Sequence, residues 1–134
     1  MTPILSRFTA VLLVLFCVSW AFASEKFKCA ECGMMVDVDS RFSAQIVDAK
    51  STLHFCDIGD LLIYLKDKKR PATGAQVKDH PTGEWLDASA AVYVHAPKSF
   101  RTPMGWSVAA FRDREKAASH GSPLDLAAMT AALK

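Results

Sequence analysis

Three cysteines at metal-ligand spacing constrain this chain more than any other feature. Cys29 and Cys32 form a Cys-x-x-Cys pair followed directly by Gly33, and Cys56 comes one predicted hairpin later. Two thiolates at this spacing can hold one soft ion, and glycine can take the positive φ that a backbone folding over a metal often needs. The pattern predicts a knuckle-like turn around a metal. A disulfide or a redox pair between Cys29 and Cys32 is the alternative.

The N-terminus has the features of a secretory signal peptide. Arg7 precedes an unbroken apolar stretch from Phe8 to Val18, and the small-x-small triplet Ala21-Phe22-Ala23 follows. We therefore expect residues 1–23 to be removed by cleavage before Ser24. The apolar stretch is shorter than the roughly 20 residues that cross a bilayer core, so membrane attachment is expected only if the segment is not cleaved.

Cys17 lies within the apolar stretch and is not expected to carry a lipid. The bulky Phe16 stands directly before it, where a lipidation site needs a small residue. Cys17 should therefore leave with the signal peptide. The expected location of the mature protein is the periplasm or another extracytoplasmic compartment.

The mature chain, residues 24–134, is long enough for one compact domain with a modest core. Loss of Arg7 leaves 15 of the 16 basic residues against 14 acidic residues, so the net charge is near zero. This balance suggests neither nucleic acid nor an anionic membrane surface as a partner. Three cysteines remain. Exported disulfide scaffolds usually have an even number, so the leftover thiol indicates metal ligation or redox work.

The apolar pattern predicts an α+β domain with a mainly antiparallel sheet. A helix is expected after Asp57, which can cap it, because apolar residues recur there at helical spacing. Further helices are expected over residues 113–119 and from Ser122-Pro123 to Lys134. The expected strands are residues 42–47, 52–55, 76–79, 85–87, 91–94 and 107–111. This order is compatible with two similar β-β-α halves.

Further candidate ligands lie near the cysteines or in a loop. His54 and Cys56 are two apart on a predicted strand, so their side chains should share a face and approach the knuckle. Met34 follows the knuckle, and Met104 lies in a Pro-Met-Gly turn that leaves a side chain open. Thiolate with imidazole suits Zn(II), whereas thiolate with thioether favours Cu(I).

Each of these residues also has a structural explanation. Methionines fill gaps in cores more often than they bind metals, and we expect this of Met35 and Met129. Cys56 alone is compatible with a small buried apolar residue, and His54 alone with a hydrogen-bonded polar residue. His80, His95 and His120 have no partner at ligand spacing and are expected at the surface.

The ordered series of motifs resembles the NosL-type accessory proteins of nitrous oxide reductase over nearly all of the mature chain. The first half is also similar to the cysteine-rich TRASH-type metal modules. The segments that carry the resemblance are Cys29-x-x-Cys32-Gly33-Met34-x-Val36, Gln45-Ile46-Val47, Phe55-Cys56-Asp57, Gly83-Glu84-Trp85-x-Asp87-Ala88, Ala91-x-Tyr93-Val94 and Met104-Gly105 before Ala110-Phe111.

The resemblance implies an extracytoplasmic protein that binds Cu(I) and delivers it to the copper cluster of nitrous oxide reductase. It also implies a small fold related to that of organomercurial lyase, and Met104 as a copper ligand. Two departures stand out. Many members are lipoproteins, whereas Cys17 lacks a suitable lipidation site, and Trp106 stands where many members have a smaller or polar residue.

We therefore expect a copper-binding accessory protein and not an enzyme. Its partners would be a copper-receiving periplasmic reductase or its assembly factors, with no small-molecule substrate. One alternative is a structural Zn(II) module closed by Cys29, Cys32, His54 and Cys56. A thiol-disulfide catalyst is a lesser alternative, because Cys29 follows the cleavage site too closely for a preceding buried strand, and residues 33–37 make a poor first helical turn.

Overall fold

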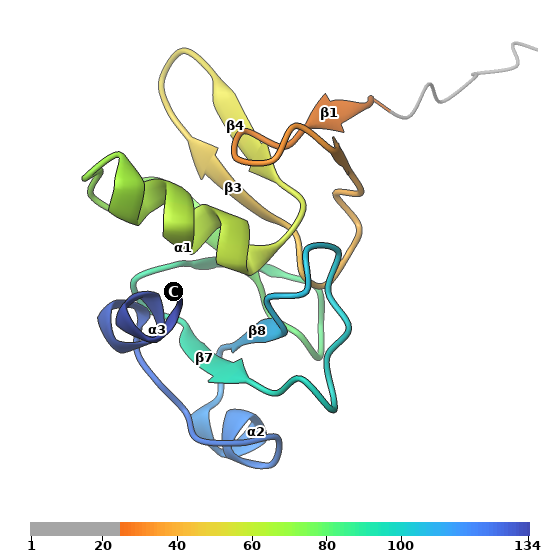
Figure 1. The fold of residues 1–134 in the computed structure, drawn as a ribbon, viewed down its shortest axis with the longest axis vertical. Helices are drawn as coiled ribbons and strands as arrows, with labels where there is room; N and C mark the ends of the chain where they lie inside the picture. Colours follow the sequence, from red (N-terminus) through yellow and green to blue (C-terminus); the bar gives the residue numbers. More distant parts are fainter. Residues whose placement is uncertain (1–24) are drawn as a thin grey trace, which may run out of the picture.

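The computed structural model describes residues 25–134, which form an α+β fold as predicted (Figure 1). The predicted signal peptide, residues 1–23, lies outside the described residues. The strands are β1 (Phe27–Lys28), β2 (Met35–Val36), β3 (Ala44–Val47), β4 (Thr52–Phe55), β5 (Ala75–Lys78), β6 (Trp85–Asp87), β7 (Val92–His95) and β8 (Val108–Phe111). The helices are α1 (Ile58–Asp67), α2 (Arg114–Ala118) and α3 (Leu126–Ala132). None of these helices is long and apolar enough to cross a membrane.

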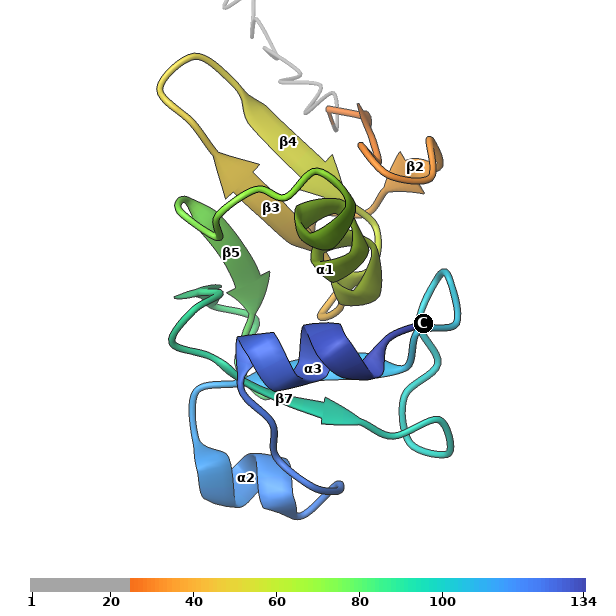
Figure 2. The same ribbon diagram turned by 60° about the vertical axis from the view of Figure 1, so that its left-hand side comes forward.

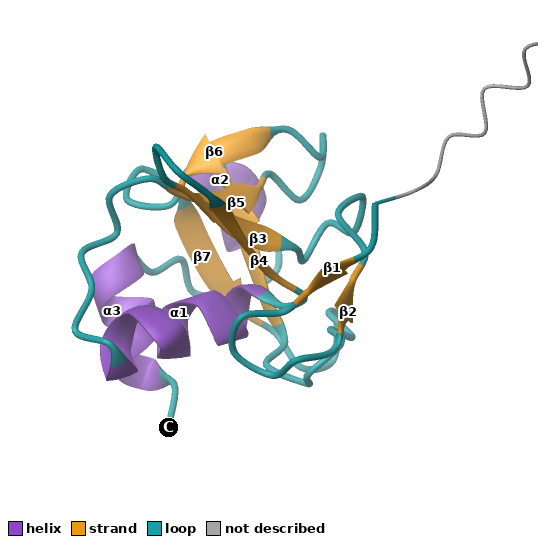
Figure 3. Cartoon of the chain, turned by 90° about the horizontal axis from the view of Figure 1, so that it is seen from above, coloured by secondary structure: helices purple, strands orange, loops and turns teal. Residues whose placement is uncertain are grey.

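All paired strands among the described residues are antiparallel. The largest sheet has the order β4-β3-β5-β6, and the pairs β1-β2 and β7-β8 flank it. Seen from above, α1 and α3 lie on the same side of the strands (Figure 3). α1 contacts β3 and β4, and α3 contacts β7, so the two helices cover different parts of one core.

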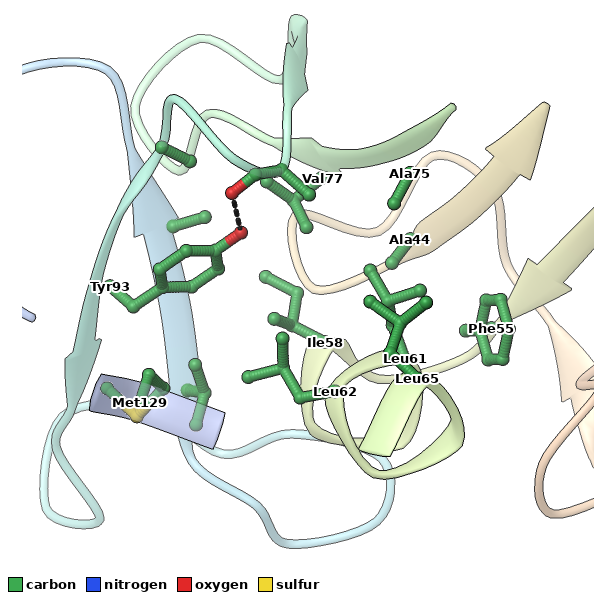
Figure 4. Close-up of a cluster of buried hydrophobic side chains, with 14 of the residues drawn as sticks. Ala44, Phe55, Ile58, Leu61, Leu62, Leu65, Ala75, Val77, Tyr93 and Met129 are labelled. Carbon is green, nitrogen blue, oxygen red and sulfur yellow. Dashed lines mark hydrogen bonds between the residues drawn. The ribbon is translucent and has the colours of Figure 1, made fainter. Parts of the chain in front are cut away.

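The core forms around α1, whose sequence dictates which face is buried. Asp57 caps the helix, because its side chain accepts a hydrogen bond from the amide of Gly59 at 3.1 Å. Full burial of an aliphatic side chain contributes about 1.5–3 kcal/mol, so four such residues on one face fix the helix against the sheet. These residues are Ile58, Leu61, Leu62 and Leu65 (Figure 4).

The second part of the core lies between α3 and β7. Met129 is fully buried there, and the hydroxyl of Tyr93 donates a hydrogen bond to the carbonyl of Ala88 at 2.6 Å (Figure 4). The last helix begins later than the sequence indicates. Leu124 exchanges two backbone hydrogen bonds of 2.8 Å with Tyr93, which keeps the chain extended beyond Pro123, and Asp125 is the actual cap.

The molecule contains an internal repeat of its local structure. The pairs β1-β2 and β5-β6 have corresponding registers, and each is closed by a turn. Both turns have a glycine at the same place, Gly33 and Gly83, with a φ of 75°. The glycine amide donates to the carbonyl of Cys29 at 2.9 Å in the first turn, and to that of Asp79 at 2.7 Å in the second.

The elements after these turns repeat in the same order. An isolated parallel bridge joins the first turn to β4, and an equivalent bridge joins the second turn to β8. The hairpins β3-β4 and β7-β8 are each followed by a helix with an aspartate cap, Asp57 for α1 and Asp113 for α2. We call residues 27–67 the first half and residues 77–118 the second half.

The halves differ most in the connection within their hairpins. β3 and β4 are joined by the short turn 48–51, whereas β7 and β8 are joined by residues 96–107, the long loop. Figure 2 shows the long loop leaving the β7-β8 hairpin and rising toward the region of α1 and β2. A segment of the second half therefore reaches the first half.

Candidate metal centre

Four side chains converge at the N-terminal end of α1. One potential ligand atom from each of Cys29, Cys32, Cys56 and Asp60 lies within 4.8 Å of all the others. The sulfur atoms of Cys32 and Cys56 are 3.4 Å apart. Oδ2 of Asp60 lies 3.3 Å from the sulfur of Cys29 and 3.5 Å from that of Cys56. All three cysteines are free thiols, so each of them can supply a ligand to an ion.

The turn between β1 and β2 presents two of these thiols. The amide of Cys29 donates to the carbonyl of Met34 at 2.7 Å, which closes the turn. Gly33 has a φ of 75°, and an added Cβ there would meet nothing within 4 Å. Glycine is thus favoured by the backbone conformation and not by lack of space. The backbone amide of Met34 also acts to lower the pKa of the Cys32 thiol.

The start of α1 supplies the other two groups. Cys56 stands just before the cap Asp57, and Asp60 comes one helical turn after Cys56. The turn into α1 folds Cys56 back over the first helical turn, which brings its thiol next to the carboxylate of Asp60. The N-terminus of a helix carries partial positive charge, and this end of α1 therefore favours anionic ligands such as thiolates.

Burial controls the protonation of the thiols. Cys29, Cys56 and Asp60 are 3%, 4% and 2% exposed, whereas Cys32 is partly exposed. Desolvation raises the pKa of Cys56 far above its ordinary value, and burial also raises the pKa of Cys32, although the Met34 amide opposes this shift. An incoming ion must displace these protons, so binding should strengthen as pH rises. Cys32 gives the centre its access to solvent.

The long loop of the second half is fastened to this centre. The indole Nε1 of Trp106 donates to Oδ1 of Asp60 at 2.7 Å, and the amide of Met104 donates to Oδ2 of Asp57 at 3.0 Å. The Trp106 side chain lies directly over Gly59, where an added Cβ would stand 2.0 Å from the ring. Only glycine at position 59 allows this contact.

The structure brings together three of the six predicted ligands. Met34 and Met104 lie at the surface, 52% and 40% exposed, on the two segments that flank the thiols. His54 is not one of the four grouped residues. Its ring stacks on Phe27 with centroids 3.8 Å apart, and its buried Nδ1 has no hydrogen-bond partner among the described residues. Desolvation lowers the pKa of His54, which keeps the ring neutral.

His54 and Cys56 do not lie on one strand, and of the two only Cys56 belongs to the four grouped residues. β4 ends at Phe55, and Cys56 already belongs to the turn into α1. The two-residue alternation of a strand therefore stops between these side chains. Ligand roles for His54, Met34 and Met104 remain predictions.

Two residues of the centre were not found by sequence reasoning, Asp60 and Trp106. Asp60 looks like an ordinary acidic residue in the first turn of a helix, where such residues are common. The sequence contains a weak signal, because Asp60 stands only four residues after Cys56, at the start of the predicted helix. No local signal links Asp60 to Trp106, which comes from the other half of the chain.

The donor set fits a soft or borderline metal ion. Three thiolates are good ligands for Cu(I), and three thiolates with one carboxylate can complete a tetrahedral Zn(II) site. Ions that prefer only oxygen ligands, such as Mg²⁺ and Ca²⁺, do not match this chemistry. The group is therefore a candidate metal centre of the Cys₃Asp type.

The equivalent place in the second half contains no thiol. The residues that correspond to the four members of the centre are Asp79, Thr82, Arg112 and Lys116. Asp79 accepts hydrogen bonds from the Thr82 hydroxyl at 2.7 Å and from the Arg112 amide at 2.9 Å. Burial acts to raise the pKa of Asp79, but these bonds and the charges of Arg112 and Lys116 lower it overall. Asp79 therefore has protein partners at the place that corresponds to Cys29.

Comparison with known proteins agrees with the resemblance seen in the sequence. The NosL family model matches residues 21–122, which include both halves of the fold. No curated protein matches the chain. Because the matched segment covers well over half of the sequence and contains the whole candidate metal centre, the chain belongs to the NosL family.

Proposed function

We propose that this protein is an extracytoplasmic Cu(I)-binding accessory protein that delivers copper to a reductase such as nitrous oxide reductase. The observation that carries the proposal is the convergence of three free thiols in a member of the NosL family. NosL proteins are accessory proteins and not a known class of enzyme, which supports a binding role. The partner would be the copper-receiving periplasmic reductase or an assembly factor.

Copper transfer requires a centre that can exchange ligands with a partner. Cys32 is partly exposed, whereas Cys29 and Cys56 are buried, so a partner ligand can approach from the Cys32 side. Met34 and Met104 are exposed near this centre and offer thioethers, which suit Cu(I). An ion held by buried thiolates and reached through one exposed thiolate can leave by stepwise ligand exchange.

A structural Zn(II) module is the second candidate, and Asp60 favours it. A fourth protein donor would close a tetrahedral shell and leave no open position for transfer. The role of Met104 distinguishes the two functions, because a thioether is a useful Cu(I) ligand and a poor Zn(II) ligand. A thiol-disulfide protein is the remaining alternative, since Cys32 and Cys56 are close enough to react after a small movement.

The test compares Met104→Ala with Met129→Ala in anaerobic Cu(I) and Zn(II) competition titrations. Met104 is 40% exposed, so its removal should weaken Cu(I) binding while Zn(II) binding and apo stability stay nearly unchanged. Met129 is fully buried, so its removal should cost about 2–5 kcal/mol of stability and leave the metal site intact.

Two results would contradict the copper proposal. One is unchanged Cu(I) affinity in Met104→Ala together with a lowered unfolding midpoint, which would make Met104 a structural residue. The other is equally tight Cu(I) binding by the thiol-blocked and the reduced protein, which would exclude the cysteines as ligands. Tight Zn(II) binding that survives Met104→Ala but is lost when the thiols are blocked would favour the structural module.

A further inference from the structure

We infer that Trp106 is a positioning residue of the metal centre, which holds the Asp60 carboxylate against the thiols and thereby sets how well the centre accepts Zn(II) relative to Cu(I). This inference rests on the proposed function, because it concerns the same centre. It assigns to a residue of the long loop a role in metal selection.

The two carboxylate oxygens of Asp60 have different partners. Oδ1 accepts the Trp106 indole N–H at 2.7 Å, and Oδ2 faces the sulfur atoms of Cys29 and Cys56 at 3.3 and 3.5 Å. Asp60 is 2% exposed, so water does not compete for either oxygen. The indole therefore fixes the rotation of the carboxylate and leaves one oxygen for an ion among the thiols.

Trp106 is itself held in place from several directions. Its side chain lies over Gly59, where any Cβ would collide with it. On one side of it, the Met104 amide is bound to Asp57. On the other side, Ser107 has a φ of 56° and its amide donates to the Thr102 hydroxyl at 3.0 Å. An uncommon positive φ in a non-glycine residue indicates a loop shape that its surroundings impose.

The fixed carboxylate affects the two ions differently. Cu(I) is a soft ion that thiolates satisfy at low coordination number, and a carboxylate adds little to its binding. Zn(II) prefers four ligands and binds carboxylate oxygen well, so an aligned Asp60 completes its shell. Trp106 should therefore raise affinity for Zn(II), while affinity for Cu(I) depends mainly on the cysteines.

The test measures Zn(II) and Cu(I) affinities of the full chain with Trp106→Phe, which keeps an aromatic ring over Gly59 and removes the N–H donor. Loss of an outer partner of a ligand typically costs about 10–100-fold in metal affinity, so Zn(II) binding should weaken by roughly 10-fold or more while Cu(I) binding is unchanged. Co(II) loading gives a second readout, because the visible spectrum of tetrahedral Co(II) should lose intensity in the variant.

Three further variants separate positioning from a general effect on the fold. Trp85→Phe is the matched control. Trp85 lies on β6 in the second half, where its ring contacts Lys78, so this substitution should leave both affinities unchanged. Asp60→Asn should reproduce the selective loss of Zn(II), and Trp106→Phe should add nothing to it. Gly59→Ala keeps both Trp106 and Asp60 but displaces the ring, so it should cause the same loss even if Trp106→Phe folds poorly.

The outcomes also separate this inference from the proposed function. Equal loss of Zn(II) and Cu(I) affinity in Trp106→Phe, or an undiminished effect of this change in the Asp60→Asn background, overturns the positioning role and leaves the copper proposal standing. A wild-type protein without thiol-dependent Cu(I) binding overturns the proposed function, whatever the tryptophan variants do to Zn(II).

Discussion

Cys56 and Cys32 keep their protons in the metal-free protein, because burial raises the pKa of both thiols. A buried thiolate without a metal would be costly, whereas a metal ion compensates its charge. Burial therefore disfavours the charged thiolate in the metal-free protein. It favours the metal-bound thiolate, because the ion compensates the charge. At this scale the centre couples metal binding to the release of protons.

The apo protein should lose stability in alkaline solution because of Cys56. The ordinary pKa of this thiol is 9.0, and its folded pKa lies higher, so the native state keeps a proton that the unfolded chain releases. Stability from this difference is complete below pH 9.0 and falls as the pH rises toward the folded pKa. Anaerobic urea unfolding of metal-free protein, compared with Cys56→Ser, should show a smaller alkaline loss in the variant. Parallel pH profiles of the two proteins would refute this coupling.

At the scale of elements, α1 has two tasks. Its apolar face packs into the core. Its N-terminal end, with Cys56 and Asp57 just before it and Asp60 in its first turn, contacts the other thiols and the long loop. The cap of this helix is therefore also an anchor for the loop. The cap of α2 is only a cap. Among the described residues, Asp113 accepts hydrogen bonds solely from the amides of its own helix.

The two aspartate caps allow this difference to be measured. Asp113→Ala should cost about 0.5–2 kcal/mol, the usual effect of removing a cap, and should leave metal binding unchanged. Asp57→Ala should cost more, because it also leaves the Met104 amide without its acceptor, and it should weaken metal binding. Urea unfolding and Zn(II) titration of both variants provide the comparison. Equal effects of the two substitutions on metal affinity would show that Asp57 is a cap and nothing more.

The sequence predicts helices and turns whose signals lie in neighbouring residues. It does not predict contacts between residues that are far apart in the chain. The spacing of Ile58, Leu61, Leu62 and Leu65 after Asp57 predicts α1 and its buried face, and the structure confirms both. The Cys-x-x-Cys pair and Cys56 indicate a shared locus, which also forms. The neighbours of Asp60, by contrast, depend on where the long loop folds, and the start of α3 depends on the pairing of Leu124 with Tyr93.

The whole molecule consists of two halves with the same local structure and different chemistry. Few residues are identical between the halves, so the sequence indicates the repeat only through the order of its predicted elements. Where the first half has Cys29, the second has Asp79, and where the first has Cys56, the second has Arg112. The place in the second half that corresponds to the centre is closed by hydrogen bonds to Asp79, and the long loop of this half contributes Trp106 to the centre of the first half.

Metal binding should therefore stabilise the molecule unevenly. Ligands that bind only the native state increase the free energy of the opening reactions that expose their site, and backbone amides near the site then exchange more slowly. We expect Zn(II) or Cu(I) to slow hydrogen exchange in residues 29–36, 54–61 and 102–107, which surround the centre or are bound to it. Residues 79–87 and 112–118, the equivalent turn and helix of the second half, should change little, because Asp79 already has its partners without a metal. Mass spectrometry of peptides after exchange, with and without a chelator, gives both measurements in one sample. Equal protection of the two halves would mean that the metal stabilises the molecule as one cooperative unit. Protection of residues 29–36 and 54–61 without any change in residues 102–107 would mean that metal binding does not stabilise the loop that contains Trp106.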